Sequence, residues 1–170
     1  MLGMSLATFT LVHVVISLLG IASGVIVVFG MFTGKRLNGM TALFLVTTIL
    51  TSVTGFGFPF TRLLPSHIVA IISLALLAIA VVARYSFHMS GGWRSGYVIT
   101  AVMAFYLNVF VLVVQSFLKV SALHALAPTG KEPPFAIAQG VVLVLFVALG
   151  YMAVKKFQPE QSPARLSRAA

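Results

Sequence analysis

Long apolar runs alternate with short polar breaks along the whole chain. A helix needs about 20 mostly apolar residues to cross the hydrocarbon core of a bilayer, where water is absent and every backbone N–H and C=O must be paired within the segment. Five stretches meet this requirement, over residues 6–32, 39–60, 67–87, 97–123 and 135–157. The pattern therefore predicts an all-α integral membrane protein, a bundle of five transmembrane helices.

The breaks between the apolar runs are short and contain turn-forming residues such as Gly34, Gly91 and Pro128. Helices joined this closely pack as antiparallel neighbours, so we expect one transmembrane domain over residues 1–157. Residues 158–170 are polar and are expected to form a tail. No second domain is predicted.

Composition supports a membrane protein. Hydrophobic residues make up 60% of the chain and charged residues only 8%, whereas soluble domains carry roughly a quarter charged residues. The net charge is +9, but the basic residues are dispersed between apolar runs, which argues against nucleic-acid binding. The absence of cysteine excludes disulfides, thiolate catalysis and cysteine-ligated metal centres.

The basic residues predict an orientation, because loops rich in lysine and arginine stay in the cytoplasm. Eight of them fall on one predicted side, namely Lys35, Arg36, Arg84, Arg94, Lys155, Lys156, Arg165 and Arg168. Three fall on the other, namely Arg62, Lys119 and Lys131. We therefore expect the N-terminus outside and the C-terminus in the cytoplasm, with the tail on the cytoplasmic side.

A stripe of small residues follows one face of the first predicted helix. Gly20 and Gly24 form a GxxxG pattern, and His13 and Ser17 continue the stripe at helical spacing. Small residues let another helix approach closely. This face is expected to pack inside the bundle, or to contact a membrane-protein partner or a second copy of the chain.

Polar residues within the apolar helices gather in the half of the bilayer that the orientation places outside. The candidates for a ligand-binding cluster are His13, Thr54, Asn108, Gln115 and Gln139. Such groups are costly to leave unpaired in lipid. They predict a polar cavity that opens outward, with independent hydrogen bonds between helices as the alternative. Residues 55–60, rich in glycine and ending in Pro-Phe, predict an unwound or kinked segment at the same depth.

Histidines raise the alternative of a b-type haem, whose iron is commonly held by imidazoles at matched depth. The candidates are His13, His67 and His124, because His88 falls at the opposite face. His67 and His124 are expected roughly 10 Å nearer the surface than His13, from the rise per residue of a helix. The spacing matches no local metal motif, so no metal site is predicted.

Residues 106–119, YLNVFVLVVQSFLK, are followed by LAPT at 126–129 and EPPF at 132–135. These segments resemble small multi-helix inner-membrane proteins of proteobacteria. The resemblance covers roughly the last two predicted helices. It implies a multi-pass protein of the bacterial inner membrane and no particular activity.

No catalytic residues are predicted, because the only two acids, Glu132 and Glu160, fall in a loop and in the tail. No buried acid is therefore available to orient a histidine beside a nucleophile. The sequence favours a non-catalytic accessory subunit or a binder of a small apolar or amphiphilic molecule. Two alternatives stay open: a haem- or quinone-linked electron carrier, and a small transporter or channel.

Overall fold

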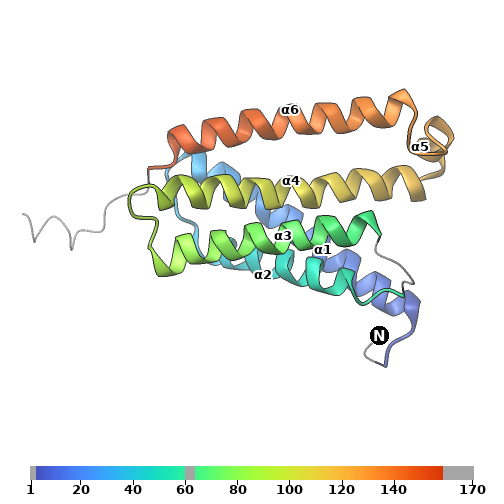
Figure 1. Ribbon diagram of the computed structural model, residues 1–170, viewed down its shortest axis with the longest axis horizontal. Helices are drawn as coiled ribbons and strands as arrows, with labels where there is room; N and C mark the ends of the chain where they lie inside the picture. The colour runs from blue at the N-terminus through green and yellow to red at the C-terminus, as the bar shows by residue number, and fades with distance from the viewer. Residues whose placement is uncertain (1–2, 60–63, 159–170) are drawn as a thin grey trace, which may run out of the picture.

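The computed structural model describes residues 3–59 and 64–158, whose helices form an elongated bundle (Figure 1). In chain order the helices are α1 (Leu6–Phe32), α2 (Asn38–Gly55), α3 (Pro65–Val81) with a π-helical continuation (Val82–Ser86), α4 (Trp93–Lys119), α5 (Ser121–Leu126) and α6 (Pro133–Lys156). All of these helices except α5 belong to segments long and apolar enough to cross a membrane, which makes five candidate spans in the described residues. The all-α prediction is confirmed to that extent.

Several sequence predictions fall outside the described residues. These are the end of the second predicted helix at residue 60, the tail from residue 159 onward, and the acid and basic residues Arg62, Glu160, Arg165 and Arg168.

The α2 helix ends at Gly55, earlier than predicted. The next two backbone N–H groups bond to carbonyls three residues back, at 3.1 and 2.9 Å, and the chain then leaves the helix. Glycine has a low helix propensity, and Gly55 and Gly57 flank this point. The expected unwound segment is therefore confirmed for the part up to Pro59.

The fourth predicted helix, over residues 97–123, is wrong at both ends. The helix begins earlier, at Trp93, and stops at Lys119. Val120 adopts an extended backbone with φ −91° and ψ 114°, and a separate short helix, α5, follows. Figure 1 shows α5 at the end of the bundle, in the turn between α4 and α6. The apolar pattern continues through this break, so hydrophobicity alone could not place it.

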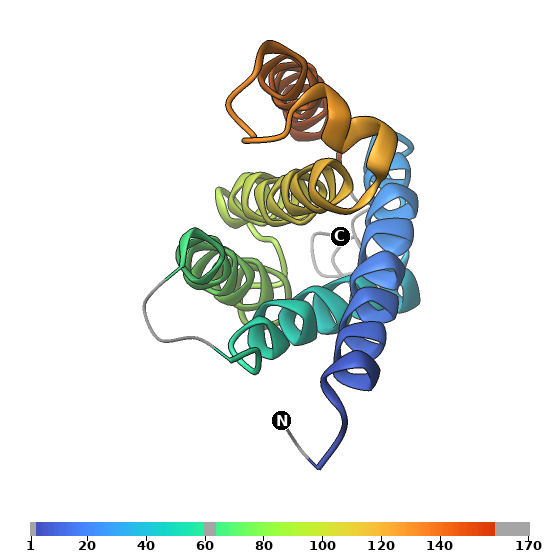
Figure 2. The same ribbon diagram turned by 90° about the vertical axis from the view of Figure 1, so that its right-hand side faces the viewer.

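Helices that follow one another pack side by side. α1 contacts α2, α2 contacts α3, and α4 contacts both α3 and α6. Figure 2, seen along the bundle, shows α4 between α3 and α6. It also shows α1 beside the bundle, on a third side of α4. The residues Val98, Ala101 and Ala104 of α4 are accordingly buried. α6 packs on one side only, and Val144 on its outer face is 69% exposed.

The small-residue stripe of α1 lies against α2 and α4 of the same chain. Both glycines are buried. A Cβ added to Gly24 would lie 2.8 Å from the ring of Phe105, and one added to Gly20 would lie 3.2 Å from Asn108 Nδ2 and from Thr47 Oγ1. The absence of a side chain is thus what allows this approach. The part of the stripe at Gly20 and Gly24 is therefore filled by contacts within the chain.

Two arginines join separate segments of the chain. Both lie at the end of the bundle where α1 and α3 end. Arg84, in the π-helical turn, is 6% exposed and donates to Arg36 O at 3.0 Å and to Asn38 Oδ1 at 2.7 Å. Arg94, at the start of α4, donates to the last carbonyls of α6, including Val154 O at 3.0 Å. A cation there complements the negative end of the helix dipole. These arginines therefore hold the bundle together in addition to adding positive charge.

We expect Gly24→Ala to destabilise the protein by about 1–3 kcal/mol, the usual cost of overpacking a core, because its methyl group would overlap the Phe105 ring. The melting temperature of the detergent-purified protein measures the effect. Gly140→Ala is the matched control, since a Cβ at that α6 position meets nothing within 4 Å. Equal melting temperatures for the two variants would contradict the close contact.

Candidate functional site

A cavity of about 570 Å³ lies at the end of the bundle where α1 begins. The first half of α1, the end of α2, the start of α3 and the second half of α4 supply its walls, so we call it the α1–α4 cavity. Its polar lining includes His13, His67, Asn108, Gln115 and Lys119. The volume falls in the range of small-molecule sites, roughly 300–1,000 Å³. Three of the five residues predicted for a ligand-binding cluster, His13, Asn108 and Gln115, therefore line one cavity.

One face of α4 supplies the longest wall of this cavity. Asn108, Gln115 and Lys119 are spaced by seven and four residues, which places them on one helical stripe. Val111 and Leu112 lie between them on the same wall. The stripe thus carries polar groups at both ends and an apolar section in the middle, as a site for an amphiphilic molecule requires.

The cavity is open on the side between α1 and α4. Val14 and Leu18 of α1 and Leu112 of α4 line it, yet they are 38%, 49% and 38% exposed. α1 approaches α4 closely at Gly24, where Phe105 packs. Figure 2 shows the N-terminal half of α1 diverging from α4 toward α2. If the helices span a bilayer, this apolar rim faces the acyl chains.

A smaller pocket of about 80 Å³ adjoins the α1–α4 cavity and shares His13, Thr51 and Asn108 with it. Thr48 Oγ1 and Asn108 Nδ2 are buried at this place without a hydrogen-bond partner within the described part of the chain. A buried donor without a partner costs about 1–3 kcal/mol. Both atoms lie close to Gly20 of α1, so they make the inner wall of the small pocket polar without exposing a donor to its interior.

Thr48 belongs to a second layer of the site that sequence reasoning did not single out. Ser52, one turn later on α2, has its Oγ 3.1 Å from Ser73 Oγ of α3, and both serines line the small pocket. The spacing of four between Thr48 and Ser52 was a usable signal. It was obscured because α2 carries hydroxyls on several faces, most of which bond to their own helix.

His13 is held by Thr54, across the α1–α2 contact. Its Nδ1 lies 2.8 Å from Thr54 Oγ1, while that hydroxyl lies 2.7 Å from Leu50 O. A carbonyl can only accept, so the single hydrogen of the Thr54 hydroxyl is donated to Leu50 O. The Nδ1–H of His13 therefore donates to the Thr54 oxygen. The Phe58 ring packs edge-on against the imidazole at 5.2 Å. Thr54, another predicted site residue, thus orients His13 without lining the cavity itself.

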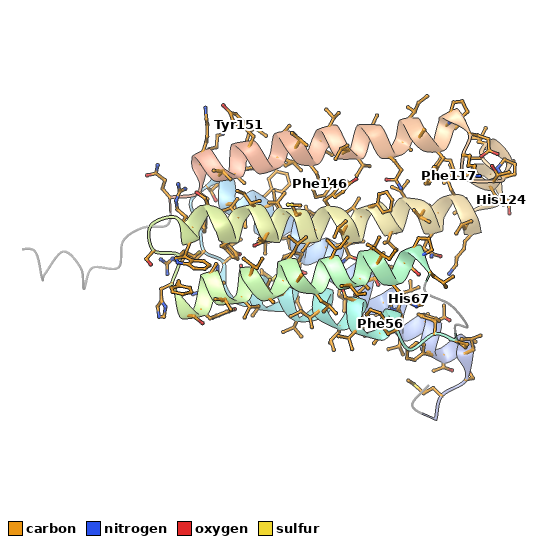
Figure 3. All side chains as sticks on the ribbon, in the orientation of Figure 1. Phe56, His67, Phe117, His124, Phe146 and Tyr151 are labelled. Carbon is orange, nitrogen blue, oxygen red and sulfur yellow. The ribbon has the colours of Figure 1, made fainter. Side chains whose placement is uncertain are left out.

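His67 is held in a different way. It is 2% exposed, and its Nδ1 accepts the backbone N–H of Leu64 at 3.1 Å. Its ring stacks on Phe56 at 5.4 Å, and Figure 3 shows the two side chains together. An accepting Nδ1 carries no proton, so the neutral ring carries its proton on Nε2. An axial haem ligand needs a lone pair directed at the iron, which this ring does not offer.

The third haem candidate lies elsewhere. His124 is exposed on α5, beyond the end of α4 (Figure 3), and it does not line the α1–α4 cavity. The donor set therefore does not fit a haem held by two histidines. The residues that the structure describes contain no group of three His, Cys, Asp or Glu side chains close enough to hold a metal ion.

Gln139 lies apart from the other predicted site residues. Its Nε2 donates to Phe110 O at 3.2 Å and so joins α6 to α4. It does not line the α1–α4 cavity. For this residue the structure supports the interhelical hydrogen bond that the sequence left as the alternative.

Glu132 accepts hydrogen bonds within the loop before α6 and does not line the α1–α4 cavity. Thr129 donates its hydroxyl to Oε1 at 2.7 Å and its backbone N–H at 3.0 Å, and Lys131 N–H donates to Oε2 at 3.0 Å. The hydrogen bond from the Thr129 hydroxyl is the main reason that the pKa of this carboxyl is lowered to about 2. The group is thus ionised and already occupied by donors of its own loop.

No protein family, curated protein or solved structure was found that matches the chain. The geometry of the α1–α4 cavity is therefore the basis for a functional proposal.

We expect ¹⁵N NMR of histidine-labelled protein to show the proton of His13 on Nδ1, with the His13→Ala variant used to assign the signal. Thr54→Val keeps the shape of the side chain but removes the acceptor, so the His13 signals should shift. Thr100→Val is the control, because the Thr100 hydroxyl bonds only within its own helix. A wild-type His13 that carries its proton on Nε2 alone would contradict the arrangement.

Proposed function

We propose that the protein is a multi-pass protein of the bacterial inner membrane that binds an amphiphilic molecule in the α1–α4 cavity without transforming it. The observation that carries the proposal is the lining of this cavity, where the polar side chains of His13, Asn108 and Gln115 lie beside an apolar rim. Such a lining suits a molecule with one polar and one apolar part.

The open side of the cavity supports entry from the membrane. Val14, Leu18 and Leu112 form an apolar rim between α1 and α4, so a molecule dissolved in the bilayer would slide in laterally without leaving an apolar medium. Its polar part would then meet the side chains of His13 and Gln115. The described residues that line the cavity include no carboxylate, and the hydroxyl bonded to His13, that of Thr54, does not line it, which agrees with binding rather than catalysis.

The orientation with the N-terminus outside is part of the proposal. Lys35, Arg36 and Lys156 lie at the end of the bundle where α1 and α6 end, together with Arg84 and Arg94. Lys119 and Lys131 lie at the end where the cavity opens. Positively charged ends are retained in the cytoplasm, so the cavity would open toward the outside.

Cysteine labelling tests this orientation against a clean background, because the chain has no cysteine. Ala125→Cys lies on exposed α5, and Gly92→Cys lies in the exposed loop before α4 at the other end. In intact cells a membrane-impermeant maleimide should react with the cysteine at 125 only, and both sites should react after permeabilisation. Labelling of the cysteine at 92 alone in intact cells would reverse the orientation.

Blocking the cavity tests binding. We expect native mass spectrometry of delipidated protein to show one saturable site for dodecanoate or for its neutral methyl ester. Leu112→Trp, which fills the wall of the cavity, should weaken that binding about tenfold or more, equivalent to about 1.4 kcal/mol. Val144→Trp places the same ring on the outer face of α6 and should leave binding unchanged.

Circular dichroism and the melting temperature of both variants verify that they fold. If neither amphiphile binds, or if Leu112→Trp and Val144→Trp bind them equally well, the proposed function is wrong.

A further inference from the structure

Lys119 is the one residue with a permanent charge among the described residues that line the α1–α4 cavity. It lies in the last turn of α4, and Val120 leaves the helix directly after it. Gln115 lies one turn earlier on the same wall. The charge is therefore part of the cavity wall and is not confined to the loop that follows.

The ammonium group of Lys119 lacks a counter-charge in the chain as described. Glu132 is the only carboxylate in residues 3–59 and 64–158. Its oxygens accept from Thr129 and from Lys131 N–H within their own loop. Lys119 is exposed at the mouth of the cavity, so an anion can reach its ammonium group, and hydrogen bonds between ionised groups are stronger than neutral ones.

The surroundings of Lys119 add donors and a second basic group. A long side chain on a helix leans toward the helix N-terminus, which for Lys119 means toward Gln115. His13 of α1 lines the same cavity. An anion bound here would receive N–H groups from Lys119 and Gln115.

We propose that the amphiphile bound in this cavity is an anion whose acidic group pairs with Lys119, with its apolar chain on the rim formed by Val14, Leu18 and Leu112. The inference rests on the proposed function. A carboxylate and a phosphate monoester share the required chemistry, namely a compact anionic oxygen cluster that accepts several N–H groups. The competing explanation is a lysine that only extends to water at the membrane surface, for which the charge of the ligand would not matter.

The test compares dodecanoate with methyl dodecanoate, which has the same chain and no charge. Wild-type protein should bind the acid at least about tenfold more tightly than the ester, which corresponds to about 1.4 kcal/mol. Lys119→Gln should abolish this preference, and Lys119→Arg should retain it. Lys155→Gln is the control, because Lys155 lies at the other end of the bundle, over the Tyr151 ring, and its loss should change nothing.

Competition between dodecanoate and dodecyl phosphate then identifies the acidic group. Stronger displacement by dodecyl phosphate assigns a phosphate, and stronger displacement by dodecanoate assigns a carboxylate; both support an anionic ligand. Equal binding of acid and ester to the wild type, or an unchanged preference in Lys119→Gln, overturns the anion proposal and leaves the cavity function intact. Absence of binding by either compound overturns the proposed function itself.

Discussion

The approach of α1 to α4 at Gly24 is the contact on which the site depends. The ring of Phe105 occupies the space that a side chain at Gly24 would need, and Gly20 makes similar room for Asn108. This contact fixes α1 at its middle. The N-terminal half of α1 then meets α2 through the His13–Thr54 hydrogen bond, and the space between α1 and α4 stays open. The Gly24–Phe105 contact and the His13–Thr54 hydrogen bond together position α1 and so define the cavity.

The cost of polar groups in an apolar medium explains why this gap is more than a packing defect. Most hydroxyls of α2 bond back to their own helix, which satisfies them without a ligand. Gln139 finds a carbonyl of α4. Asn108 and Thr48 find no partner within the residues described, and they lie together in the small pocket beside the cavity. Gln139 Oε1 is also unpaired in that part of the chain and lies away from the cavity, so two of these three groups belong to residues that line the small pocket.

The sequence predicted the general architecture because the feature that dictates it, hydrophobic length, is local. It predicted the unwound end of α2 for the same reason, from glycine and proline. It could not predict the break at Val120, because a valine inside an apolar run is compatible with a continued helix. Depth along each helix placed His13, Asn108 and Gln115 near one another, but it also placed Gln139 with them. Depth does not reveal on which side of α4 a residue lies, and only the packing of α6 separated Gln139 from the cavity.

Photolabelling tests the central claim, that the gap between α1 and α4 holds an amphiphile, most directly. Dodecanoate carrying a diazirine would be activated with the protein in lipid nanodiscs, and the modified residues would be mapped by mass spectrometry. The account predicts saturable labelling of residues 14–18 and 111–116, suppressed by excess unlabelled dodecanoate, while labelling of the exposed face of α6 around Val144 persists. Labelling of α1 and α4 that excess dodecanoate leaves unchanged, as at the lipid-exposed face of α6, would contradict it.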